Sequence, residues 1–174
     1  MFIFRMGLSC ALACAYLGGA IGADPGLGHD ATEAQVSAID ISISPSGAGL
    51  PSGGGTATEG ETVYASKCAS CHGAGGQGKP ADRLVGGIDT LASKQPVKTV
   101  NSFWPYATTL FDYIRRAMPF NAPMSLTNDQ VYAVTAYILA QDNIVASGER
   151  LDATTLPSVK MPNRDGFVDR STIR

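Results

Sequence analysis

The segment Cys68-Ala69-Ser70-Cys71-His72 constrains this chain more than any other feature of its sequence. Its two thiols stand three residues apart, and an imidazole follows the second thiol directly. The only other cysteines, Cys10 and Cys14, lie near the N-terminus in an apolar segment with the pattern of a targeting leader. The chemistry of the remaining chain therefore depends on what these two thiols and this imidazole hold.

The Cys-x-x-Cys-His pattern is the attachment signature of c-type heme. Two thiols at this spacing can bond the two vinyl groups on one edge of a porphyrin, and the next residue brings an imidazole under the iron. A redox dithiol is an alternative that favours a thioredoxin-like βαβ setting. Zinc is another, but it needs two further ligands from a chain whose only other histidine is His29. We predict one covalent heme c per chain, held by Cys68 and Cys71, with His72 as an iron ligand.

A six-coordinate heme also needs a second axial ligand, and methionine paired with histidine raises the reduction potential. Outside the leader the methionines are Met118, Met124 and Met161. Met118 follows a predicted helix and precedes Pro119, which stops the helix and helps to fix the loop that carries the sulfur. We favour Met118, with Met124 and Met161 as alternatives. Trp104 is a candidate hydrogen-bond donor to heme propionates, although an ordinary core aromatic fits it as well.

Residues 1–23 have the layout of a secretory signal peptide, with Arg5, an apolar run over residues 7–21 and small residues before Asp24. The run is shorter than the roughly 20 residues of a transmembrane helix, so no membrane span is expected. A lipid anchor on a leader cysteine is disfavoured, because the expected Leu-small-small pattern is missing. We expect an exported, periplasmic protein with the leader removed.

The net charge is −2 and the sequence has no basic stretch, so nucleic acid is not an expected partner.

Residues 24–57 are rich in Gly, Pro and Ser and cannot bury enough apolar surface to fold alone. Apolar residues at positions 36, 39, 41 and 43 suit an extended strand on another surface, or a solvated tether with a few apolar side chains. Residues 146–174 are predicted to form an extended C-terminal tail.

Three helices are expected between these arms, in a domain over residues 58–145 that needs no sheet. The first begins at Thr58, where Thr58 and Glu61 have the spacing of a capping box, and runs into the Cys-x-x-Cys-His segment. The second covers residues 109–117. The third begins at Thr127, which repeats the capping box with Gln130 and precedes an apolar stripe. The fold class is therefore all-α with extended N- and C-terminal arms.

The motif, the terminal helices and the Met118-Pro119-Phe120 loop resemble class I c-type cytochromes. A closer resemblance is to the cytochrome subunit of the Sox sulfane dehydrogenase and to the cytochrome partners of periplasmic molybdenum sulfite dehydrogenases. The stretches that carry it are residues 60–68, 96–100, 103–108, 111–120 and 131–137, with flanks at 38–51 and 160–167. The resemblance implies a class I cytochrome c fold and His72 and Met118 as axial ligands. The Sox subunit typically carries two hemes, whereas this chain has one motif and resembles only the first heme domain.

The expected function is the transfer of single electrons, with the heme supplying the redox step. The resemblance implies that a molybdenum-containing dehydrogenase subunit oxidises the sulfur compound, and that electrons pass on to a downstream cytochrome or oxidase. No catalytic residue is assigned, since the chain alone is not expected to be catalytic. The alternatives are a heme enzyme and a small-ligand sensor with a displaceable distal methionine.

Overall fold

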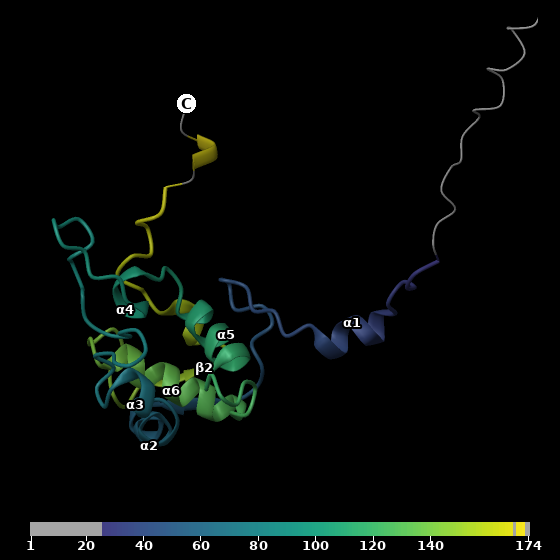
Figure 1. Ribbon diagram of the computed structural model, residues 1–174, viewed down its shortest axis with the longest axis horizontal. Helices are drawn as coiled ribbons and strands as arrows, with labels where there is room; N and C mark the ends of the chain where they lie inside the picture. Colours follow the sequence, from purple (N-terminus) through teal and green to yellow (C-terminus); the bar gives the residue numbers. More distant parts are fainter. Residues whose placement is uncertain (1–25, 169, 173–174) are drawn as a thin grey trace, which may run out of the picture. The chain divides into compact units, whose positions relative to one another are not determined.

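The computed structural model describes residues 26–168 and 170–172 (Figure 1). The predicted signal peptide lies outside these residues. The chain divides into two compact units, Met1–Asp40 and Ile41–Arg174. The second unit contains the Cys-x-x-Cys-His segment and every buried core residue among those that the structure describes.

The described part of the first unit is built on one short helix, α1 (Glu33–Ile39), which has no buried residue. Thr32 precedes it, and the Thr32 side chain accepts from the Gln35 N–H while the Gln35 side chain accepts from the Thr32 N–H. The predicted extended backbone is therefore wrong at Val36 and Ile39. The capping box satisfies the free N–H groups of a first turn, and a spacing of three also places both apolar side chains on one helical face.

Three longer helices form the frame of the second unit: α2 (Ala57–Lys67), α5 (Ala107–Ala117) and α6 (Asn128–Ala140). Helices α2 and α5 both pack against α6. Gly60 is the closest point of the α2–α6 crossing, since a Cβ atom there would overlap the carbonyl oxygen of Ala133. One turn further along, the rings of Tyr64 and Tyr137 lie 4.8 Å apart. The predicted all-α architecture is confirmed, and α6 is its central helix.

The helix starts differ from the predictions at two of three positions. Helix α6 begins as predicted, with the Thr127–Gln130 capping box formed. Helix α2 instead uses Thr56 and Glu59, so the predicted box at Thr58 is wrong. Thr56–Glu59 and Thr58–Glu61 both have the spacing of a capping box. The box forms at Thr56 because the preceding residues are a strand, which ends at Thr56. Helix α5 begins at Ala107, two residues earlier than predicted, without a side-chain cap.

A small antiparallel sheet, which the sequence did not predict, joins the two flanks of the helical domain. Strand β1 (Gly54–Thr56) pairs with β2 (Arg150–Asp152), with Gly55 opposite Leu151. Both strands lie against α6. A Cβ at Gly55 would come within 2.6 Å of the Ala133 side chain, so glycine allows this close approach.

Both flanks contribute to the packing of the second unit. The Tyr132 hydroxyl donates to the carbonyl of Pro51 at 2.9 Å. Beyond β2, the chain passes through a short 3₁₀ helix, η1 (Leu156–Ser158), and buries Leu151, Leu156 and Met161. The helical core thus extends past residue 145 into the predicted tail.

The remaining elements are short. They are α3 (Ala69–His72), α4 (Val100–Phe103) and a 3₁₀ turn, η2 (Arg170–Thr172). Within the described ranges, every helix is too short or too polar to cross a bilayer.

Candidate heme site

The Cys-x-x-Cys-His segment folds as a single helical turn. Cys68 is the last cap residue of α2, and the chain turns there directly into α3, which ends at His72. The N–H groups of Cys71 and His72 both donate to the carbonyl of Cys68, at 3.1 and 3.0 Å. The turn places the two cysteine side chains on the same side, because residues three apart in a helix are neighbours. Both thiols are free, with Cys68 half-buried and Cys71 exposed.

The His72 imidazole is held by one ring nitrogen. Its Nδ1 lies 2.7 Å from the carbonyl oxygen of Asp82. Since a carbonyl oxygen only accepts hydrogen bonds, Nδ1 carries the proton and Nε2 keeps its lone pair. A backbone carbonyl on the second nitrogen is the usual arrangement for a metal-binding histidine. His72 is therefore oriented and in the correct tautomer to bind iron through Nε2.

The loop after His72 folds back over the motif, which brings the Asp82 carbonyl to the ring. Gly78 N–H donates to the His72 carbonyl at 2.7 Å, and Ala81 N–H donates to the Cys71 carbonyl at 2.9 Å. Gly78 has a φ of 91°, a backbone conformation that residues with a side chain rarely adopt. The Tyr64 hydroxyl donates to the Gly73 carbonyl at 2.9 Å and fixes the start of the loop on α2.

The Cys68 thiol does not have the character of a redox nucleophile. Burial raises the pKa of Cys68 to about 11, and the neighbouring Cys71 adds to the effect. Reactive dithiols require a lowered pKa, since the thiolate is the nucleophile. Within residues 26–168 and 170–172, no three His, Cys, Asp or Glu side chains gather as a zinc site requires. The raised pKa of Cys68 thereby disfavours the redox-dithiol alternative.

Several apolar side chains of the second unit pack against the core while keeping part of their surface accessible. Among them are Val63, Leu84, Val85, Trp104, Met118 and Leu126. They come from α2, the loop after His72, the end of α4 and the segments on both sides of Pro119. Apolar side chains of this kind are available to contact a flat apolar cofactor.

Comparison with known proteins agrees with this geometry. Residues 57–142 match the family model described as cytochrome c. The chain is also similar to a crystal structure of the sulfane dehydrogenase SoxCD from Paracoccus pantotrophus. The identity is 38% and the TM-score 0.77, over 86% of this chain and 75% of that chain. The chain belongs to the cytochrome c family. A search of curated proteins finds no match.

The predicted class I cytochrome, resembling the cytochrome subunit of a Sox sulfane dehydrogenase, is confirmed. Membership of the cytochrome c family implies a covalently bound heme c and a role in electron transfer, and Cys68 and Cys71 lie within the matched range.

The three methionines of the cytochrome lie in different environments. Met118 is the last cap residue of α5 and is half-buried against the core. Met124 is 64% exposed. Met161 is 3% exposed and enclosed by the core. Of the three, Met118 alone combines accessible surface with contact to the core.

Trp104 also packs against the core of the cytochrome. It is half-buried at the end of α4, and its ring meets that of Tyr113 edge-on at 5.7 Å. Its indole N–H donates to none of the residues that the structure describes, which leaves this donor available to a carboxylate.

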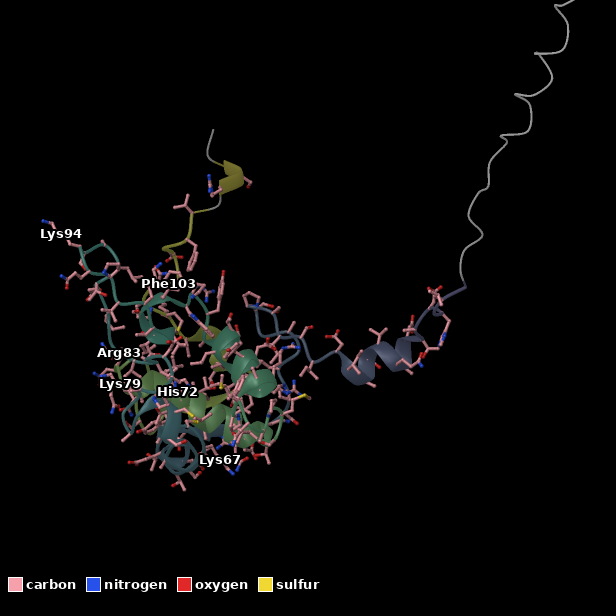
Figure 2. The ribbon with its side chains drawn as sticks, viewed as in Figure 1. Lys67, His72, Lys79, Arg83, Lys94 and Phe103 are labelled. Carbon is pink, nitrogen blue, oxygen red and sulfur yellow. The ribbon has the colours of Figure 1, made fainter. Side chains whose placement is uncertain are left out.

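Basic residues surround the motif on the exposed side. Lys67 precedes Cys68, and Lys79 and Arg83 lie on the loop that covers His72. Figure 2 shows the side chains of Lys79 and Arg83 directed away from the domain. All three are exposed, and none forms an ion pair with another described residue. The surface next to the motif therefore carries uncompensated positive charge, although the whole chain is slightly acidic.

One functional group was missed by the sequence reasoning. The partner of His72 is the backbone carbonyl of Asp82, ten residues further along. The Asp82 side chain takes no part in this hydrogen bond, so the identity of the residue does not predict the contact.

Proposed function

We propose that this cytochrome is an exported, single-heme electron carrier that accepts electrons from a molybdenum-containing sulfane or sulfite dehydrogenase subunit. The observation that carries the proposal is the oriented His72 imidazole beside two free thiols, in a chain 38% identical to a sulfane dehydrogenase structure. The periplasm is the compartment we infer, since residues 1–23 have the layout of a signal peptide. The electrons would pass to a downstream cytochrome or oxidase.

In this proposal Cys68 and Cys71 would hold the heme covalently, and His72 Nε2 and the Met118 sulfur would be the protein ligands of its iron. Trp104 would donate its indole N–H to a propionate. The heme, when bound, supplies one-electron oxidation and reduction of its iron. The protein contributes a fixed imidazole, a thioether that favours the reduced state, and an apolar surround. A methionine on the second axial position leaves no open site for substrate, so oxidation of the sulfur compound falls to the partner.

The basic surface around the motif suits this role. Lys67, Lys79 and Arg83 are exposed and unpaired among the described residues. Complementary charge accelerates encounter more than it tightens binding. An acidic area on the dehydrogenase would therefore guide the partner to the side on which Cys71 is exposed.

The proposal is tested by purifying the full mature chain together with whatever copurifies from its native source. We expect a molybdenum-containing protein in the same fractions, and reduction of the heme when sulfite or a sulfane compound is added. The cytochrome alone should not be reduced by either compound. Reduction of the isolated cytochrome by sulfite, or the absence of any molybdenum protein that reduces it, would contradict the proposed partner.

A further inference from the structure

The orientation of His72 depends on a loop. Among the described residues, the Asp82 carbonyl is the one hydrogen-bond partner of the imidazole. Asp82 lies in the irregular segment between α3 and α4. The position of its carbonyl oxygen is therefore set by whatever holds that segment in place.

The hydrogen bonds near Asp82 join the loop to α3 and to itself. Ala81 N–H donates to the carbonyl of Cys71 in α3, and Leu84 N–H donates to the carbonyl of Gly76 at 2.9 Å. The Arg83 side chain donates to the carbonyl of Gln77 at 3.3 Å. These bonds fix the shape of the loop on α3, but they do not connect its second half to α2, α5 or α6.

Gly86 makes that connection, four residues after Asp82. Its N–H donates to Oδ2 of Asp142 at 2.7 Å. Its carbonyl accepts from the Thr99 hydroxyl at 2.8 Å. Tyr64 holds the start of the loop on α2, and Asp142 and Thr99 hold the end that contains Asp82.

Asp142 is itself fixed from the side of the core. It stands two residues after the end of α6, and its Oδ2 also accepts from Nδ2 of Asn101 at 2.7 Å. Asn101 is completely buried, and the same Nδ2 donates to the carbonyl of Ile138 at 2.8 Å. One carboxylate oxygen thus joins the loop, α4 and the end of α6.

We propose that Asp142 is a positioning residue for the axial histidine, acting through Gly86 and the carbonyl of Asp82. This inference rests on His72 as the iron ligand and is independent of the electron donor. A firm bond from Nδ1 to the carbonyl makes the imidazole more basic. A more basic ligand favours the oxidised iron. Releasing the loop should therefore weaken this bond and raise the reduction potential.

The test compares variants of the full mature holoprotein. Asp142→Ala removes the acceptor. Asp142→Asn keeps one oxygen that can accept both bonds but removes the charge. The matched control is Asp129→Ala, because Asp129 also ties a glycine N–H to α6. It lies in the first turn of α6 and accepts from Gly54 at 2.8 Å. The readouts are the exchange rate of the His72 Nδ1 proton by NMR and the reduction potential by redox titration.

We expect exchange of the Nδ1 proton to accelerate about tenfold in Asp142→Ala, which is the scale of losing one hydrogen bond to a charged group. In Asp142→Asn the exchange rate should rise about threefold. The asparagine keeps neutral hydrogen bonds, which are roughly half as strong as hydrogen bonds to a charged group. The potential should rise in the same order, and Asp129→Ala should match the wild type in both readouts.

The inference is wrong if Asp142→Ala changes both readouts no more than Asp129→Ala does. If Asp142→Ala does not mature, Asp142→Asn decides: accelerated exchange supports the inference, and the wild-type rate overturns it. Neither measurement requires a partner, so failure here is distinct from failure of the proposed electron donor.

Discussion

The three methionines that could bind the iron differ in the solvent exposure of their side chains. Met124 extends into solvent and Met161 is sealed in the core, whereas Met118 is half-buried at the end of α5. A methionine that binds a cofactor needs part of its side chain accessible to the cofactor and the rest packed against the core. Met118 alone meets both conditions.

Replacing Met118 by Ala should therefore abolish the sulfur-to-iron charge-transfer band of the oxidised protein. The potential should fall, because a thioether stabilises the reduced iron. A hundredfold preference for the reduced state corresponds to about 120 mV for one electron. Met124→Ala is the control and should keep both the band and the potential. The assignment fails if Met124→Ala or Met161→Ala loses the band while Met118→Ala retains it.

A second residue-scale prediction concerns Tyr64, whose hydroxyl fixes Gly73 beside His72. Burial raises the pKa of Tyr64 to about 12. The unfolded phenol has a pKa near 10. Between these values the unfolded chain has lost the proton and the folded chain keeps it, so the free energy of unfolding falls as pH rises.

Urea unfolding at about pH 9 and about pH 11.5 should show this loss, and Tyr64→Phe should reduce it by about 2 kcal/mol. Tyr113→Phe serves as the control, because Tyr113 is 47% exposed. An equal loss in the wild type and in Tyr64→Phe would contradict the burial argument.

The residues of the site differ in how far sequence could predict them. Cys68, Cys71 and His72 carry distinctive side chains at a fixed spacing, so the pattern alone predicts them as a heme-attachment site. The Asp82 carbonyl was not predictable, because every residue has a carbonyl and the loop path decides which one reaches the ring. The role that we propose for Asp142 was not predictable either, since it depends on a contact with Gly86 far away in sequence.

At the scale of elements, the β1–β2 pair makes the tail part of the domain. Leu151 in β2 and Leu156 in η1 are completely buried. The tail therefore contributes to stability, whereas α1 buries no residue.

Leu151→Ala should lower the free energy of unfolding by about 3 kcal/mol, the usual cost of truncating a buried leucine. The matched control is Ile39→Ala in α1, where the side chain is 80% exposed and no loss is expected. Chemical denaturation followed by circular dichroism measures both. A loss in Ile39→Ala equal to that in Leu151→Ala would contradict the assignment of α1 to a separate unit.

The elements also show where sequence patterns are ambiguous. Thr56–Glu59 and Thr58–Glu61 have identical spacing, and only the strand before Thr56 selects the first pair. The sheet has three residues on each strand, with partners as distant as Gly54 and Asp152. Strands this short have no readable alternation, so the pairing arises from packing on α6.

At the scale of the molecule, charge is distributed unevenly along the chain. Residues 24–61 contain six acidic residues and no Lys or Arg. Lys67, Lys79 and Arg83 follow around the motif, with only Asp82 as an acidic residue between them. This arrangement supports guided approach of an acidic partner to the exposed side of the site.

Reversing two of these charges, in Lys79→Glu with Arg83→Glu, should slow electron uptake from the dehydrogenase roughly tenfold at low salt. The difference should shrink as salt increases, because screening weakens the attraction. Lys160→Glu, on the tail, is the control and should behave as the wild type. Stopped-flow reduction measures all three proteins. Equal rates for the double variant and the control would exclude a role for this surface.

We propose that Cys68 and Cys71 hold one heme covalently and that His72 is a ligand of its iron. The decisive experiment is intact-mass spectrometry of the mature protein after denaturation in acidic organic solvent. We expect a polypeptide heavier than its sequence by the mass of one heme, in both the wild type and Met118→Ala. A polypeptide at its bare sequence mass, with heme released into the solvent or zinc in its place, would contradict it.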